Sequence, residues 1–119
     1  MKIKALKKLL YNIRDNGYGD WIVYFCDDED DDYTVNHIYV DNDGDICLES
    51  TDMEGDGNYD FTVNDILRRI KKYDNENYVY FLEEYEDGSS TGYDIKFNSY
   101  LGTDDWGNTI LNIDCYPCD

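Results

Sequence analysis

The stretch Trp21-Ile22-Val23-Tyr24-Phe25-Cys26 is a run of aromatic and β-branched residues of strand length. Asn77-Tyr78-Val79-Tyr80-Phe81-Leu82 has the same character, and both runs contain the tripeptide Val-Tyr-Phe. Runs of this kind that are bounded by turn-forming or charged residues are typical of strands. Two such runs in one short chain predict two similar units, each contributing one of these strands.

A helix is expected before each of these strands. Apolar residues recur at helical spacing from Ile3 to Ile13, and Asn16-Gly17 provides a stop signal. A second helix begins after Thr62, which can cap it together with Asp65, and its apolar face continues to Tyr73. The apolar positions that match at constant spacing are Ile3, Leu6 and Leu10 in the first helix and Val63, Ile66 and Ile70 in the second.

Further strands are predicted in both halves of the chain. Thr34–Val40 and Asp45–Ser50 are expected to form a hairpin through Asp41-Asn42-Asp43-Gly44, because Gly, Asn and Asp tolerate the positive φ of tight turns. Tyr93–Ser99 and Thr109–Cys115 are the corresponding strands of the second half. The strands of the two halves align only after a short deletion between helix and strand.

This order of elements predicts an α+β protein of two repeated α-β-β-β units, residues 1–51 and 59–119, with residues 52–58 as a linker. Neither unit has enough core to be stable alone, so a single domain over residues 1–119 with pseudo-twofold symmetry is expected. An antiparallel sheet with both helices packed on one face fits the pattern. Chance alternation of elements is the other explanation of the repeat.

The charge of the chain is strongly unbalanced. Its 119 residues include 28 acidic and 10 basic residues, which gives a formal net charge of −18. The basic residues gather in the two predicted helical segments, so the folded molecule is expected to be electrically lopsided. Aromatic residues make up 16% of the chain, which argues against a disordered acidic tail. The charge also argues against direct binding to nucleic acid or to an anionic membrane.

The carboxylates are concentrated between Asp27 and Asp60, where fourteen acidic residues occur without a Lys or Arg. Like charges at this density oppose compaction, so we interpret them as serving a partner. The predicted partner-binding residues are the acidic block after the first strand, its counterpart after the second, and the acids at hairpin tips. They are Asp27, Asp28, Glu29, Asp30, Asp31, Asp32, Glu83, Glu84, Glu86, Asp87, Asp41, Asp43, Asp45, Asp104 and Asp105.

Acidic strands can present charge on the scale of a nucleic-acid backbone. Side chains on one face of a strand lie about 6.6 Å apart and neighbouring strands about 4.8 Å apart. Duplex DNA carries one negative charge per about 1.7 Å of its axis. A lattice of carboxylates would therefore compete for a nucleic-acid channel, with aromatic residues as additional anchors. These aromatic residues are Tyr33, Tyr39, Tyr59, Tyr85, Tyr93, Tyr100 and Trp106.

Two motifs suggest metal binding without supporting it well. Asp41-Asn42-Asp43-Gly44-Asp45 matches the start of an EF-hand loop, but Ile46 replaces the required Gly and Asp52 the bidentate Glu. A hairpin turn is favoured there, with weak nonspecific binding of divalent cations. Cys115 and Cys118 have the spacing of a zinc or redox pair, but no second such pair accompanies them. No cofactor is predicted, and Cys26 and Cys47 are expected to be buried free thiols.

An enzyme is not predicted. His37 is the only histidine, and no P-loop, Rossmann glycine fingerprint, G-x-S-x-G or H-E-x-x-H motif occurs. The chain also has no apolar run of membrane-spanning length and no secretory leader, so a cytosolic location is expected.

In size, acidity and lack of catalytic motifs the chain resembles the small phage-encoded DNA-mimic inhibitors, the anti-restriction and anti-CRISPR proteins. The resemblance is one of composition over the whole chain, without a shared motif, and it transfers no site residues. It implies a non-enzymatic inhibitor in the host cytosol that blocks the nucleic-acid-binding site of a defence nuclease. The alternatives are an immunity protein or antitoxin against a basic nuclease toxin, a calcium-binding or other acidic interaction module, and acidity that serves solubility alone.

Overall fold

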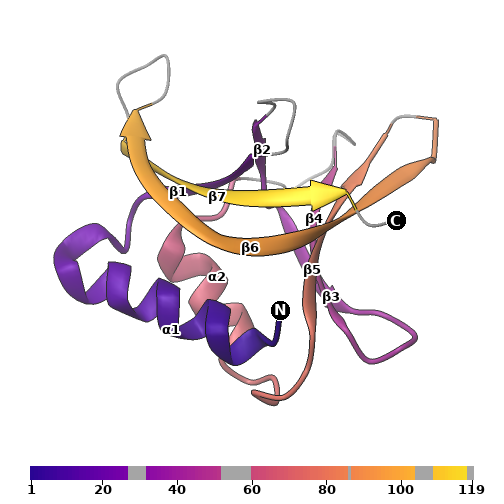
Figure 1. Cartoon of the computed structure of the whole chain (residues 1–119), viewed down its shortest axis with the longest axis horizontal. Helices are drawn as coiled ribbons and strands as arrows, with labels where there is room; N and C mark the ends of the chain where they lie inside the picture. Colours follow the sequence, from indigo (N-terminus) through magenta and orange to yellow (C-terminus); the bar gives the residue numbers. More distant parts are fainter. Residues whose placement is uncertain (27–31, 52–59, 86, 104–108, 118–119) are drawn as a thin grey trace.

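The computed structural model describes residues 1–26, 32–51, 60–85, 87–103 and 109–117, and only the backbone at 32, 51, 96–103, 109–112 and 114–117. Helices and strands alternate along the chain, which confirms the α+β class (Figure 1). In chain order they are α1 (Ile3–Ile13), η1 (Arg14–Tyr18), β1 (Ile22–Cys26), β2 (Asp32–Thr34), β3 (His37–Val40), β4 (Ile46–Thr51), α2 (Val63–Ile70), β5 (Val79–Glu84), β6 (Ser90–Thr103) and β7 (Thr109–Pro117).

The strands form one seven-stranded sheet in the order β2-β1-β7-β6-β5-β4-β3. Four of the neighbouring pairs are antiparallel, whereas β1 with β7 and β4 with β5 are parallel. The sheet is therefore mixed, whereas the sequence pattern suggested a purely antiparallel one. Both parallel pairs join a strand of the first half of the chain to a strand of the second half, so the two halves share one sheet.

The prediction of a single strand over Thr34–Val40 is wrong. It is divided at Val35 and Asn36 into β2, which pairs with β1, and β3, which pairs with β4. The side chain of Val35 is fully buried, and its carbonyl accepts a hydrogen bond from the Phe61 amide at 2.9 Å. Because β2 and β3 are the two outermost strands of the sheet, these two residues bring its edges together, and the sheet must curl.

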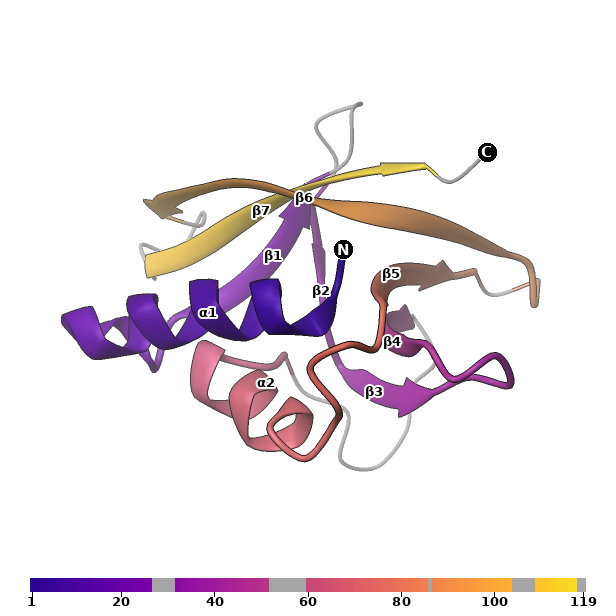
Figure 2. The ribbon, with the colours of Figure 1, turned by 60° about the horizontal axis from the view of Figure 1, so that its bottom comes forward.

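Both helices pack on the same side of the curled sheet, as predicted (Figure 2). Their apolar faces meet the inward side chains of the strands in one core, where Phe25 and Phe81 stack with ring centroids 4.9 Å apart. The fully buried helix residues include Ile3, Leu6, Leu10, Val63, Ile66 and Ile70, the six positions matched between the two halves.

Local signals in the sequence explain where the helices begin and end. Thr62 Oγ1 accepts a hydrogen bond from the Asp65 amide at 3.2 Å, and Asp65 Oδ2 accepts one from the Thr62 amide at 3.1 Å. This reciprocal pair confirms the predicted cap of α2. Gly17, with φ of 95°, has the left-handed conformation that stops the helical segment after α1.

The residue that precedes each helix forms a β-bridge with a residue in or next to a strand of the other half of the chain. Lys2 bridges Tyr78 next to β5, and Thr62 bridges Ile22 of β1. Flanking backbone bonds repeat the exchange, because the Val79 amide donates to Met1 and the Val23 amide to Phe61. Such reciprocal contacts are what two similar units related by a twofold axis produce. The internal repeat itself stays a prediction.

Replacing Phe81 tests this shared core. Phe81→Ala removes a fully buried ring that stacks on Phe25, so the free energy of unfolding is expected to fall by about 3–5 kcal/mol in urea denaturation. Val40→Ala, on the edge strand and 44% exposed, is the control and is expected to change stability by less than about 0.5 kcal/mol. Similar losses for both variants would contradict the proposed core.

Candidate functional site

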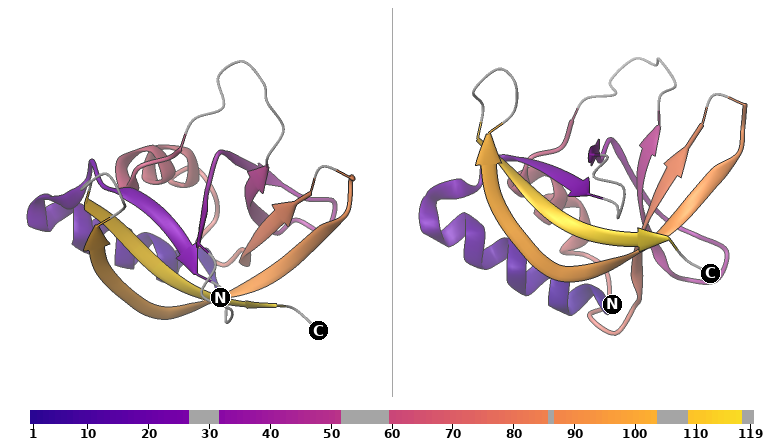
Figure 3. Two further views of the ribbon diagram at one scale, coloured as in Figure 1. Left: turned by 90° about the horizontal axis from the view of Figure 1, so that it is seen from above. Right: turned by 45° about the horizontal axis from the view of Figure 1, so that its top comes forward.

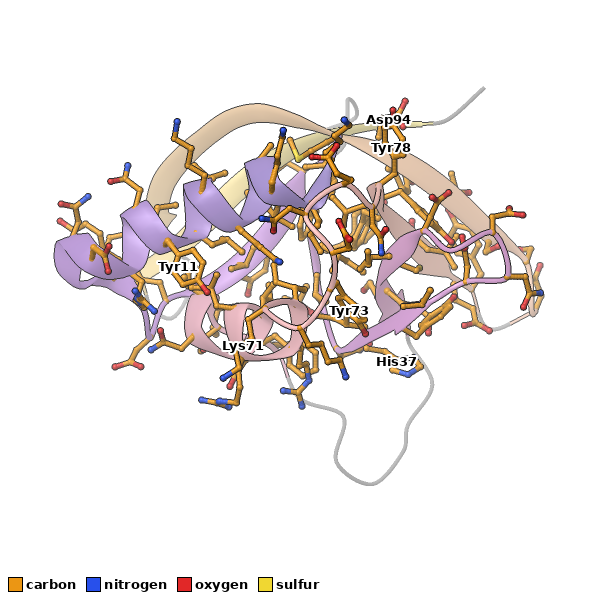
Figure 4. The ribbon with its side chains drawn as sticks, turned by 90° about the horizontal axis from the view of Figure 1, so that it is seen from below. Tyr11, His37, Lys71, Tyr73, Tyr78 and Asp94 are labelled. Carbon is orange, nitrogen blue, oxygen red and sulfur yellow. The ribbon has the colours of Figure 1, made fainter. Side chains whose placement is uncertain are left out.

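The basic side chains that the structure describes lie on α1, on α2 or on the residues that flank these helices. Lys2 and Lys4 reach Glu76 at 2.5 and 3.4 Å, Arg14 reaches Asp15 at 3.0 Å, and Arg68 reaches Asp65 at 3.3 Å. Figure 4, viewed from below, shows Tyr11 and Lys71 over the helices and His37 over β3. We call α1, η1, α2 and the residues that flank them the helix layer. Within the described part of the chain, the acids in these ion pairs belong to the helix layer, and none of them is a predicted partner-binding acid.

The structure describes seven of the predicted partner-binding residues. Glu83 and Glu84 end β5, directly opposite Ser50 and Thr51 of the parallel strand β4. Asp32 starts β2, and its backbone pairs with Cys26 at the end of β1. Asp41, Asp43, Asp45 and Asp87 lie in the turns that follow β3 and β5. The remaining residues lie outside the described part of the chain: Asp27, Asp28, Glu29, Asp30, Asp31, Glu86, Asp104 and Asp105.

These acids lie at opposite ends of the strands. The pairings give β1, β4, β5 and β7 the same direction, so their carboxyl ends lie on one side of the sheet. Glu83 and Glu84 are on this side, where β4 and β5 end together (Figure 3). The β3–β4 turn that carries Asp41, Asp43 and Asp45 lies at the other end of β4. The described acids therefore do not form one continuous surface.

The Asp41 carboxylate holds its own turn together. Its Oδ1 accepts hydrogen bonds from the Asp43 and Asp45 amides at 2.9 Å, and Oδ2 accepts one from the Tyr80 hydroxyl at 2.9 Å. Gly44, with φ of 85°, completes the turn, which confirms the predicted hairpin. Desolvation alone would raise the pKa of Asp41, but hydrogen bonds from Asp45, Tyr80 and Asp43 lower it overall.

The other described acids accept fewer hydrogen bonds than Asp41. Asp43 is exposed, with only its backbone in the turn network. Glu83 accepts a hydrogen bond from the Tyr93 hydroxyl at 3.3 Å. Asp87 accepts hydrogen bonds from the Ser89 hydroxyl and amide, which lower the pKa of this carboxyl. Because these acids have no Lys or Arg partner among the described residues, their charge is available to an incoming cation.

A second group of polar residues lies on the face of β3, β4 and β5 that points away from the core. Tyr39 and Tyr80 stand directly opposite Cys47 from the two neighbouring strands, and His37 stands opposite Glu49. The Tyr39 hydroxyl donates to Glu49 Oε2 at 3.1 Å, and His37 Nδ1 lies 3.3 Å from Glu49 Oε1. We call this group the β3–β5 outer face; its residues are His37, Tyr39, Asp41, Cys47, Glu49 and Tyr80.

Sequence reasoning missed most of this face. The sequence predicts Tyr39 as an aromatic anchor, Asp41 as a partner-binding acid and Cys47 as a buried free thiol, but it assigns no role to His37, Glu49 or Tyr80. Alternation in β3 and β4 puts these residues opposite the core-facing side chains, but the pairing of β4 with β5 was needed to bring Tyr80 beside them.

The β3–β5 outer face contains Cys, His and Glu, yet its geometry does not suit nucleophilic catalysis. The Cys47 side chain has no exposed surface, and burial raises the pKa of its thiol. A nucleophilic cysteine needs an accessible thiolate with a lowered pKa. Burial likewise raises the pKa of the Tyr39 and Tyr80 phenols. These groups stay protonated at neutral pH and act as hydrogen-bond donors.

The predicted aromatic anchors have different positions. Tyr93 is only 4% exposed and belongs to the core, so it is not a surface anchor. Tyr33 is partly buried and packs beside Tyr93 with ring centroids 6.1 Å apart. Tyr85 is 37% exposed and Tyr39 is partly buried. Tyr59 and Trp106 lie outside the described residues, and only the backbone of Tyr100 is described.

The structure gives little geometry for a metal site. Among the described residues, no group of three or more His, Cys, Asp or Glu side chains is arranged to hold an ion. Strands flank the β3–β4 turn, as expected for a hairpin and unlike the helices of an EF-hand. Cys26 and Cys47 are buried and are not joined in a disulfide, as predicted. Only the backbone of Cys115 is described, and Cys118 lies outside the described residues.

Comparisons with known proteins give no match: no family model, curated protein or solved structure is significantly similar to this chain. In the described part of the chain, no helix has the length and apolar character needed to cross a membrane.

The role of Asp41 can be tested by its effect on stability. Asp41→Ala removes an acceptor of three hydrogen bonds, so at pH 7 the free energy of unfolding is expected to fall by about 1–2 kcal/mol. Because folding lowers the pKa of this carboxyl, its contribution is present above the unfolded value of about 3.9 and is lost as the pH falls through the lower folded value.

The difference between wild type and Asp41→Ala, measured by urea denaturation, should therefore shrink below about pH 4. Asp43→Ala is the matched control, since it removes the same charge from an exposed position in the same turn. A loss for Asp43→Ala as large as that for Asp41→Ala would refute the turn network.

Proposed function

We propose that this protein is a non-enzymatic inhibitor. Its acidic strand ends and turns occupy the nucleic-acid-binding surface of a basic partner protein. The observation that carries the proposal is the separation of charge. Lys2, Lys4, Arg14 and Arg68 pair with acids of the helix layer. Among the described residues, no Lys or Arg pairs with the carboxylates of Glu83, Glu84, Asp43 and Asp87.

Unneutralised carboxylates on a chain of net charge −18 favour a partner of opposite charge. Complementary charge accelerates association and makes it sensitive to salt, because ions screen the attraction. The strand ends that carry Glu83 and Glu84 belong to paired strands, so these carboxylates are held on a rigid support. Acids held on strands about 4.8 Å apart present charge at spacings that a surface built for phosphates can accept.

The partner class follows from this charge pattern and from the compositional resemblance to DNA-mimic inhibitors. Proteins that hold nucleic acid do so with Lys and Arg surfaces. We propose a nuclease of a bacterial defence system as the partner, blocked by a phage-encoded protein without turnover. A nuclease toxin neutralised by an immunity protein would present a similar basic surface, so the identity of the captured partner decides between the two.

The test is affinity capture from the source cells, with the whole protein immobilised and the bound proteins identified by mass spectrometry. We expect a basic nucleic-acid-binding protein that is retained at low salt, released at high salt and displaced by added duplex DNA. Glu83→Gln combined with Glu84→Gln should weaken its binding by about tenfold.

The matched control is Asp15→Asn combined with Glu76→Gln, which changes the net charge equally but on the helix layer, next to Arg14 and Lys2. This variant should bind the partner as the wild type does. The proposal fails if duplex DNA does not compete, or if both double variants lose binding equally, because the effect would then come from net charge alone.

A further inference from the structure

We propose that the β3–β5 outer face is the part of the surface that receives arginine side chains of the basic partner. This inference rests on the proposed function and identifies which chemical group of the partner is bound. Its basis is the arrangement of two tyrosine rings, two carboxylates and a buried thiol on three adjacent strands.

The hydroxyl contacts orient the two rings. Tyr39 stands on β3 and Tyr80 on β5, directly opposite Cys47 on the strand between them. Their hydroxyls donate to carboxylates across the sheet, Tyr39 to Glu49 on β4 and Tyr80 to Asp41 in the turn after β3. Cys47, between the two tyrosines, has no exposed surface, while both tyrosines remain partly exposed.

The carboxylates border the rings. The Tyr80 hydroxyl donates to Asp41 Oδ2 at 2.9 Å, and the Tyr39 hydroxyl donates to Glu49 Oε2 at 3.1 Å. Glu49 is only 7% exposed, although it lies on the face that points away from the core. The face therefore offers two aromatic surfaces between two negative charges, and the ion pairs described for Lys and Arg do not involve either carboxylate.

Three aromatic rings elsewhere in the described residues have cations of this chain above them. Arg14 lies 4.7 Å from the centre of the Tyr11 ring, Arg69 lies 4.2 Å from Phe61, and Lys72 lies 5.3 Å from Tyr73. All three cations belong to the helix layer and its flanks. Among the described residues, no Lys or Arg lies over Tyr39 or Tyr80, and the His37 ring lies beside Tyr39 with ring centroids 5.0 Å apart.

The chemistry selects arginine. A planar guanidinium stacks on an aromatic ring and can donate hydrogen bonds to an adjacent carboxylate at the same time. Lysine presents a compact, strongly hydrated ammonium that combines these contacts less well. Anionic ligands are repelled by Asp41 and Glu49. Arginine is also the cationic residue that recurs at energetic centres of protein interfaces, together with tyrosine.

The test uses fluorescent oligo-arginine and oligo-lysine peptides of equal length as probes and the whole protein at fixed salt. We expect the oligo-arginine peptide to bind about tenfold more tightly. Tyr39→Leu combined with Tyr80→Leu should reduce this ratio to about one while leaving the oligo-lysine affinity nearly unchanged. Tyr11→Leu combined with Tyr73→Leu is the control, because those rings carry internal cations, and it should keep the wild-type ratio.

A measurement on the wild-type protein covers the case in which the leucine variant does not fold. The ring resonances of Tyr39 and Tyr80 in an NMR spectrum should shift on addition of oligo-arginine and not of oligo-lysine. Equal affinities for the two peptides, together with unchanged Tyr39 and Tyr80 signals, would overturn this inference and leave the proposed function standing. Binding of neither peptide would overturn both.

Discussion

The fold depends on a reciprocal set of backbone hydrogen bonds at the N-termini of the two α-helices. Met1 and Ile3 bond to the segment that leads into β5, and Phe61 and Val63 bond to the segment that leads into β1. Each helix is thereby fixed to a strand of the other half, and the parallel pairs β1–β7 and β4–β5 continue the exchange into the sheet. Residues of both halves contribute to one core, so we expect the chain to fold as one cooperative unit.

The same arrangement separates the charges. The helices carry basic residues on the surface that faces away from the core. Asp15 and Asp65 pair with Arg14 and Arg68, which are close in sequence, and Glu76, which follows α2, pairs with Lys2 and Lys4 at the start of α1. The strands carry their acids at their ends and on their outer face. A carboxylate such as Glu83 is therefore out of reach of the cations that pair within the helix layer. This separation is the reason to expect a binding protein rather than a chain whose acidity only maintains solubility.

Local patterns in the sequence predicted much of the fold. The two apolar helix faces, the Thr62–Asp65 cap and the hairpin at Gly44 depend on residues near one another in the chain, and all three are observed. The break at Val35 and the parallel pairing of β4 with β5 depend on contacts between distant residues, such as the bond from the Phe61 amide, so no local pattern could indicate them. The same reason explains the missed site: Tyr80 joins Cys47 and Asp41 only through that parallel pairing.

The outermost strands β2 and β3 are short, with three and four residues. A long, flat edge strand offers unpaired amides and carbonyls to another copy and so promotes aggregation. Here the connection through Val35 and Asn36 turns the two edges toward each other within one molecule. Both features disfavour edge-to-edge pairing of two copies, and the net charge of −18 adds repulsion between them.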